Sequence, residues 1–181
     1  MKHILFVFVA GLISALTPTN GAFAQTSNLL ASKDLVNNYF KIGNAEVSNN
    51  PNIINLEMVN VKALKNFRKQ YKVSDEKWSQ GINCITASYV LDSMNETVYF
   101  SEKGNWEASL KTYQEDIMPV EIRKMIKQQY YDYKIIVVSE IETFENKGNP
   151  VYLVTLEDAN HIKEIRIQGN VMDVYKDFIK R

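Results

Sequence analysis

The sequence reads Lys103-Gly104-Asn105-Trp106-Glu107-Ala108-Ser109-Leu110-Lys111-Thr112-Tyr113 near its middle and returns to the same pattern at Gln168-Gly169-Asn170-Val171-Met172-Asp173-Val174-Tyr175-Lys176-Asp177-Phe178. In both stretches a Gly-Asn pair is followed by a lysine and then by an aromatic residue at the same spacing. Both residues of the pair tolerate a positive φ, which is typical of a tight turn that leads into a strand. Because a pattern that recurs along a chain indicates a repeated structural unit, we expect one supersecondary unit to be used twice.

Alternating hydrophobicity around these stretches predicts a sheet. Trp106, Ala108 and Leu110 share one side of a strand, and their polar neighbours share the other. Residues 72–80 are mostly polar, so we expect a loop there that packs Trp78 against the core. The other strands expected from the same pattern are 82–91, 97–101, 134–144, 150–157, 161–167 and 171–175.

Two amphipathic helices are expected, one before each group of strands. The apolar stripe of the first consists of Val61, Leu64, Phe67 and Tyr71, and that of the second of Ile122, Met125, Ile126 and Tyr130. Pro119 suits the first turn of the second helix. Strands that follow one helix and are joined by tight turns favour antiparallel pairing. We therefore predict an α+β fold with a tandem α-β-β-β repeat, an antiparallel sheet with both helices packed on one face, and halves at about 59–114 and 117–179.

Residues 1–24 are expected to be a signal peptide. An apolar run from Ile4 to Leu16 precedes Ala22-Phe23-Ala24, which has the small-x-small pattern of a cleavage site. As a helix this run would reach about 20 Å, too short for a bilayer core of about 30 Å, which argues against the alternative of an uncleaved membrane anchor. We expect cleavage after Ala24 and a periplasmic or secreted mature protein that does not span a membrane. The asparagine-rich residues 25–58 are expected to form a partly disordered lead-in to a domain at 59–181.

The composition is typical of a globular protein and excludes one class of partner. Of 181 residues, 45% are apolar and 23% are charged. The 21 basic and 21 acidic residues are mixed along the chain, so no basic block supports nucleic-acid binding. Cys84 is the single cysteine, so no internal disulfide can form, and we expect it to be a small buried apolar residue.

Several motifs resemble a known family. The chain contains Ala63-x3-Phe67-x3-Tyr71, then Trp78 and Lys103-Gly104-Asn105-Trp106. It continues with Leu110-Lys111-Thr112-Tyr113, Met118-Pro119 and Tyr130-Tyr131-Asp132-Tyr133. Over about residues 58–179 this pattern resembles the PepSY-like group of the β-lactamase-inhibitor-protein-like (BLIP-like) superfamily, which consists of small exported bacterial proteins. The resemblance implies the tandem helix-and-sheet layout and a surface that binds proteins.

No cluster in the sequence indicates catalysis, a metal or a cofactor. His161 is the only histidine after the expected cleavage site, whereas metal and proton-transfer sites usually combine several ligating groups. Glu140 and Glu142 alternate with apolar residues, as on the solvated face of a strand. We therefore expect no cofactor and no enzymatic activity, with a hydrolase that uses Glu140, Glu142 or His161 as a distant alternative.

The function favoured by these observations is an exported, non-enzymatic binding module. It would recognise a protein or peptide in the periplasm through a sheet face. Tyr and Trp are typical interface anchors. We expect Tyr99 to be exposed because Val98 and Phe100 would take the buried side, and Tyr131 and Tyr133 lie off the helical stripe. The alternative is a domain that binds a small ligand or a cell-wall fragment in a pocket between helices and sheet.

Overall fold

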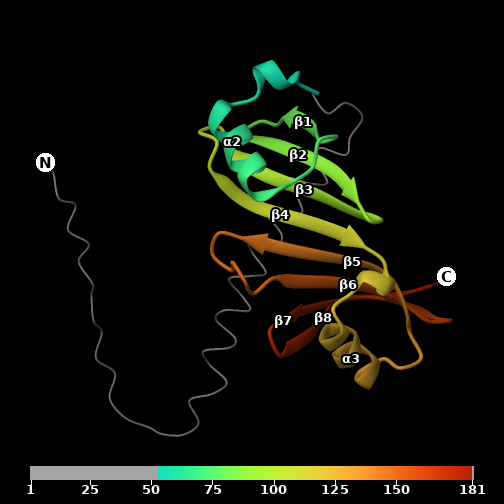
Figure 1. Cartoon of the computed structure of the whole chain (residues 1–181). Coiled ribbons are helices and arrows are strands. Elements are labelled where there is room, and N and C mark those ends of the chain that lie inside the picture. Colours follow the sequence, from blue (N-terminus) through green and yellow to red (C-terminus); the bar gives the residue numbers. More distant parts are fainter. Residues whose placement is uncertain (1–52, 181) are drawn as a thin grey trace, which may run out of the picture.

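The computed structural model describes residues 53–180, which form one eight-stranded sheet and two α-helices (Figure 1). The expected signal peptide and residues 25–52 of the expected lead-in lie outside the described residues. The strands are β1 (Lys77–Gln80), β2 (Cys84–Leu91), β3 (Met94–Ser101), β4 (Trp106–Tyr113), β5 (Lys134–Thr143), β6 (Val151–Glu157), β7 (His161–Gln168) and β8 (Val171–Ile179). They lie in sequence order, and each pairs antiparallel with the next.

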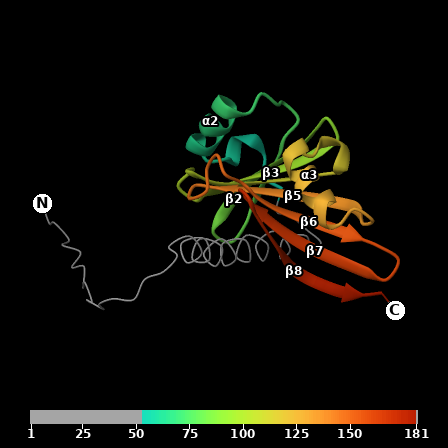
Figure 2. The ribbon, with the colours of Figure 1, turned by 90° about the horizontal axis from the view of Figure 1, so that it is seen from below.

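The helices are α2 (Val61–Gln70) and α3 (Val120–Gln129), each preceded by a short 3-10 turn, η1 (Leu56–Met58) or η2 (Glu115–Ile117). Both helices lie on the same face of the sheet, towards its opposite ends (Figures 1 and 2). The predicted α+β class and the antiparallel sheet with helices on one face are thus confirmed. No helix among residues 53–180 is long and apolar enough to cross a membrane.

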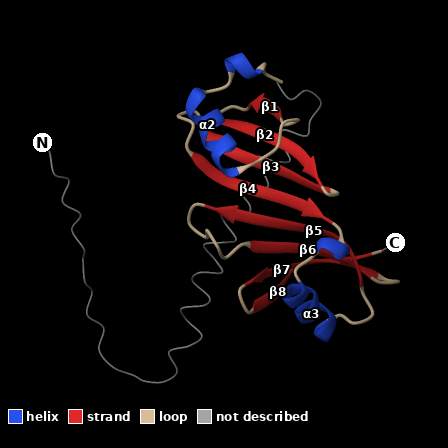
Figure 3. Cartoon of the chain, viewed as in Figure 1, coloured by secondary structure: helices blue, strands red, loops and turns tan. Residues whose placement is uncertain are grey.

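Each helix is followed by four strands (Figure 3). Four were expected from the pattern of the second half, but only three from that of the first. In the first half the additional strand is β1, which lies where a loop was expected. Trp78 pairs with Ala87 of β2 and is buried, as predicted, whereas its neighbours Lys77 and Ser79 are not. A strand of four residues with one apolar side chain is too short to show an alternating pattern, so periodicity alone could not find it.

Two apolar cores lie on the helix-bearing face. Phe67 of α2 packs with Trp78, Ala87 and Val98, while Ile126 of α3 packs in a separate core. The second core also contains Ile135, Val138, Val154, Leu156, Ile165 and Ile167. A smaller cluster of Ile141, Val151 and Leu153 lies on the opposite face. Pairing of β4 with β5 joins the two halves into one continuous sheet.

The two Gly-Asn turns have the same backbone conformation but different surroundings. Gly104 and Gly169 both have positive φ, 74° and 56° respectively. A Cβ at Gly104 would lie 2.5 Å from Asn60 Oδ1 and 2.6 Å from the Ala63 nitrogen, so α2 is packed directly on the β3–β4 turn. At Gly169 the nearest atom, Asn149 Oδ1, is 3.9 Å away. Only the first turn therefore needs glycine for space as well as for conformation.

Hydrogen bonds fix α2 to the β3–β4 turn. The Asn60 side chain caps the helix by accepting from the Lys62 and Ala63 nitrogens, and its Nδ2 donates to the Glu102 carbonyl at 3.0 Å. Asn66 Nδ2 donates to the Gly104 carbonyl at 2.9 Å. By contrast, α3 begins after Pro119 with no side-chain cap.

A candidate binding groove on the helix-bearing face

A groove of about 1210 Å³ lies between α2, the β3–β4 turn, the start of β4 and the β5–β6 loop. Its walls come from segments far apart in the chain, from Asn66 on α2 to Lys147 on the β5–β6 loop. Two aromatic side chains line it: Trp106 is half-buried, and Phe144 is 77% exposed. The groove therefore combines an aromatic surface with a polar rim.

Six charged side chains line the groove, namely Lys69, Lys103, Lys147, Glu102, Glu107 and Glu145. None of them forms an ion pair with another residue in the described range 53–180. Ion pairs occur instead elsewhere, for example between Arg68 and Glu76 at 2.5 Å. Unpaired charges of both signs around one groove leave it able to make complementary electrostatic contacts with a partner.

The β5–β6 loop is held in place by its own hydrogen bonds. Asn146 Oδ1 accepts from the Thr143 nitrogen at 2.5 Å and from Thr143 Oγ1 at 3.1 Å. Glu142 Oε1 accepts from the Gly148 nitrogen at 2.7 Å, and the Phe144 nitrogen donates to the Glu107 carbonyl at 3.0 Å. This wall of the groove is thus preorganised, which lowers the entropy lost on binding.

The indole of Trp106 forms part of the groove and also borders the polar centre of the sheet. Lys147 Nζ lies over the ring, 5.4 Å from its centroid, at a distance typical of a cation–π contact. The Nε1 atom is buried and makes no hydrogen bond of ordinary geometry with any residue in 53–180, although it lies near the Tyr71 hydroxyl. Burial raises the pKa of Tyr71, and the charge of Glu96 raises that pKa further.

A polar row crosses the helix-bearing face between the two cores. Directly opposite residues on β2 to β6 form it in the order Tyr89, Glu96, Lys111, Glu140 and Tyr152. Lys111 Nζ donates to Glu140 Oε1 at 3.0 Å, and Tyr89 OH donates to Glu96 Oε2 at 2.5 Å. Burial raises the pKa of the Glu96 carboxyl, and the Tyr89 hydrogen bond and the Lys111 charge act against that rise.

The three tyrosines predicted to form a partner-binding surface do not come together. The prediction that Tyr99 is exposed is wrong, because its side chain is only 5% exposed. The alternation argument assumed that water covers the face opposite the helices, but the neighbours of Tyr99 on that face, Thr86 and Ala108, are buried too. Tyr131 is 81% exposed, whereas Tyr133 is half-buried against the α3 core.

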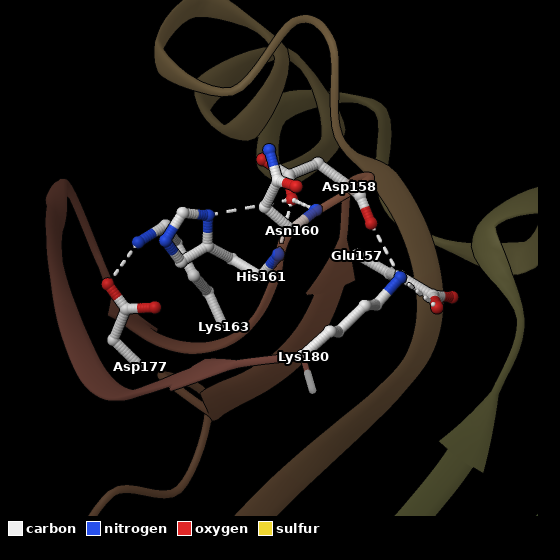
Figure 4. A network of polar contacts seen from close by, with 7 residues as sticks. All are labelled: Glu157, Asp158, Asn160, His161, Lys163, Asp177 and Lys180. Carbon is white, nitrogen blue, oxygen red and sulfur yellow. Dashed lines mark hydrogen bonds and ion pairs between the residues drawn. The ribbon is translucent and has the colours of Figure 1, made fainter.

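His161 lies in a network that closes the β6–β7 turn onto β8 (Figure 4). Asp158 Oδ1 accepts from the Asn160 and His161 nitrogens at 2.7 and 2.5 Å, and His161 Nδ1 lies 3.6 Å from the same oxygen. Desolvation opposes the change, but these backbone hydrogen bonds lower the pKa of Asp158 to about 2. Lys180 Nζ pairs with Glu157 at 2.6 Å, so the network fastens the turn to the last strand.

The three residues named for the hydrolase alternative form hydrogen bonds with different partners. Glu140 accepts from Lys111 and from Tyr113 OH, while Glu142 accepts from the β5–β6 loop. His161 is the first residue of β7, and its nitrogens interact with Asp158. Within residues 53–180 no group of three or more His, Cys, Asp or Glu residues could hold a metal ion. Cys84 is buried, as predicted.

The groove was missed by sequence reasoning, although one signal for it was present. Phe144 has the same strand parity as Glu140 and Glu142, so the alternation that predicts exposed carboxylates also predicts an exposed aromatic ring beside a turn. No local pattern brings Lys69 and Lys103 to the same place, because only the tertiary packing of α2 on the turn does so.

Comparison with known proteins supports the fold. The sequence matches no protein-family model and no curated protein sequence. Among solved structures, a DUF2874 family protein from Bacteroides uniformis ATCC 8492 has a TM-score of 0.52 and 13% identity, covering 67% of this chain and 89% of its own. A BLIP-like protein from Bacteroides fragilis NCTC 9343 has a TM-score of 0.52 and 16% identity, covering 65% and 84%.

A third neighbour, from Bacteroides eggerthii DSM 20697, is provisionally described as a periplasmic protein. It has a TM-score of 0.51 and 14% identity, and the match covers 66% of this chain and 87% of that one. At these identities the likeness concerns the fold alone, namely helices packed on one face of an antiparallel sheet.

Proposed function

We propose that this protein is a non-enzymatic binding module of the bacterial envelope, which recognises a polypeptide segment in the groove on its helix-bearing face. The observation that carries the proposal is the set of six charged side chains around Trp106 and Phe144 that form no ion pair within residues 53–180. Charged groups that find no partner within a fold are available to steer and orient a binding partner. An exposed aromatic beside them supplies a large apolar contact.

The shape of the groove favours a polypeptide over a compact ligand. Its volume of about 1210 Å³ exceeds the roughly 300–1,000 Å³ of most small-molecule pockets. It is also lined by side chains from several surface segments, which suits an extended chain.

The proposal also includes an envelope location, a family assignment and an origin of the two halves by duplication. The predicted cleavage after Ala24 and the provisional periplasmic description of one structural neighbour support an envelope location. The motifs quoted above and the BLIP-like neighbours support assignment to the PepSY-like group. Because a 3-10 turn, a ten-residue helix and four strands occur twice in the same order, we infer that the two halves arose by duplication.

Site-specific photo-crosslinking in the producing cell tests the proposal. A photoreactive phenylalanine analogue at Phe144 should crosslink to an envelope protein, whereas the same group at Lys124, exposed on α3, should not. Lys147→Glu should weaken the Phe144 crosslink by about tenfold or less, and added salt should weaken it in the parent protein. Equal crosslinking at Phe144 and Lys124 would refute the groove as the site.

The same experiment tests the surface predicted at Tyr131 and Tyr133. Tyr131 is well exposed at the end of α3, away from the groove residues, so it is a suitable crosslinking position. A specific crosslink at Tyr131 without one at Phe144 would transfer the proposed function to that surface.

A small ligand or cell-wall fragment is the second candidate, since side-chain amides of Gln70, Asn83 and Asn105 also line the groove. Such a ligand would raise the melting temperature by mass action. A thermal-shift screen against envelope metabolites and cell-wall fragments separates the two. A ligand whose shift is lost in Trp106→Ala but kept in Tyr131→Ala would favour this candidate.

A further inference from the structure

The two edges of the sheet differ in length and protection. β1 has four residues, and its outer side is partly closed because the Ile54 nitrogen donates to the Trp78 carbonyl at 3.0 Å. β8 has nine residues, and no other strand in the described range pairs with its outer side. Its apolar side chains Val174, Phe178 and Ile179 are 48%, 54% and 76% exposed. A long open edge with exposed apolar side chains is a template for pairing with another strand.

A bulge in β8 sets which of its side chains share a face. Ile165 pairs with Val174 and Glu164 with Lys176, so Tyr175 is an extra residue in the strand. As a result Asp173 and Lys176 lie on the same face, opposite the helices. There Asp173 pairs with Arg166 at 3.1 Å and Lys176 with Glu164 at 2.7 Å.

We propose that β8 pairs antiparallel with β8 of a second copy of this chain, about a two-fold axis between Val174 and Tyr175. In this register Asp173 faces Lys176 of the second copy, and the contact occurs twice. Residues directly opposite in an antiparallel pair point to the same face, and the bulge brings Asp173 and Lys176 to one face. At the axis itself Val174 faces the helices and Tyr175 packs on the opposite face, so regular pairing is interrupted where the two bulges meet. Val171 and Phe178 face each other in the same way, so an apolar pair flanks each charged pair.

Charge complementarity between the two β8 strands favours this register, and it favours a second copy of the chain as the partner of the open edge. Across the four strands that meet at the axis, the row runs Arg166, Asp173, then Lys176 and Glu164 of the second copy, so its charges alternate. The neighbouring register places Asp173 opposite Phe178 and matches the faces of all its pairs, but it places no opposite charges directly across from each other. Self-complementarity of this kind is what a two-fold interface requires.

The edge is already fixed in a pairing conformation. Lys163 pairs with Asp177, and Lys180 Nζ pairs with Glu157 and donates to the Asp158 carbonyl (Figure 4). β8 therefore loses little conformational freedom when it pairs. The interface contains none of the groove residues, so the assembly presents two grooves, and a partner with two recognition segments would bind with increased avidity.

Sedimentation equilibrium of the full exported protein over a concentration series tests the proposal. The parent protein should have the mass of a dimer. Lys176→Glu should raise the dimer dissociation constant about tenfold, because two cross-strand pairs change from attractive to repulsive. Lys124→Glu makes the same charge change on the exposed side of α3 and should leave the constant unchanged. A monomer at every concentration up to roughly 1 mM would overturn the proposal.

A spin-label measurement keeps the test decisive if Lys176→Glu also impairs folding. In a Cys84→Ser background, a nitroxide at Val174→Cys should show strong dipolar broadening, because paired strands lie about 4.8 Å apart. The same label at Ile82→Cys, an exposed position in the β1–β2 connection, should show none. A dimer with broadening at position 82 but not at 174, or with neither, would show that copies associate through another surface and refute the β8 interface.

Discussion

The two halves of this protein share an order of elements, but they differ in how their Gly-Asn turns are packed and in how their charged residues are paired. In the first half the helix is packed on the Gly-Asn turn at Gly104, and the charged side chains of the adjoining groove form no ion pair within the described residues 53–180. In the second half the turn at Gly169 is open, and β8 pairs its charges with those of β7, as in Arg166–Asp173 and Lys176–Glu164. The same helix-and-sheet unit thus has a tightly packed turn beside the groove in the first half and an open turn with charge pairs between β7 and β8 in the second.

The largest expected effect tests whether the halves are independent. Phe67→Ala empties the centre of the α2 core and should cost about 3–5 kcal/mol of unfolding free energy. Because β4 and β5 join the halves in one sheet, we expect a single unfolding transition at lower denaturant, by both fluorescence and circular dichroism. Tyr131→Ala, at an exposed site, should change stability by less than about 0.5 kcal/mol. Two separate transitions in Phe67→Ala would show that the α3 half folds alone.

The next effect separates the two turns. Gly104→Ala should cost about 2–4 kcal/mol, since it combines a left-handed backbone with a collision against the start of α2. Gly169→Ala meets only the backbone penalty and should cost about 1–2 kcal/mol. Equal losses in urea denaturation would mean that close packing at Gly104 contributes nothing.

A smaller effect concerns the start of each helix. Asn60→Ala removes the α2 cap and the bond to the Glu102 carbonyl, so a loss of about 1–2 kcal/mol is expected. Pro119→Ala should cost less, because α3 has no side-chain cap to lose. Hydrogen exchange should show faster opening of the first turn of α2 in Asn60→Ala alone.

The smallest effects are opposite pH dependences in the two halves. The pKa of Glu96 is raised by burial, so stability should fall as pH rises from its ordinary 4.5 through the raised folded-state value. Glu96→Gln should abolish that fall.

The pKa of Asp158 is lowered to about 2, so its contribution to the unfolding free energy should be lost as pH falls from 3.8 through that value. Asp158→Asn should remove this acid-side loss, as measured by unfolding free energy across pH 1–8, and an unchanged pH profile in both variants would contradict the assignment.

Features that depend on residues close together in the sequence could be predicted, whereas features that depend on tertiary contacts could not. The helix stripes at Phe67 and Ile126 and the turns at Gly104 and Gly169 depend on local spacing and were predicted correctly, except that Val61 of the first stripe is 80% exposed. The burial of Tyr99 was not, because it depends on what covers the second face of the sheet. The candidate groove depends on three segments that meet only in the folded chain.

The two similar stretches differ at one position whose surroundings can be compared, Ala108 in the first and Asp173 in the second. Ala108 is buried on β4, and the corresponding Asp173 on β8 could not be buried unpaired without a large cost. The structure resolves this by placing Asp173 on the edge strand beside Arg166.

The order of the strands has a consequence for how the protein is made. Each strand pairs only with its neighbours in sequence, so a chain that emerges from its amino end can complete α2 and β1 to β4 before β5 appears. During that interval β4 is the open edge, and each later strand closes the edge left by the one before it. Assembly can therefore proceed strand by strand along the sheet, with short loop closures and few long-range contacts, which favours fast folding.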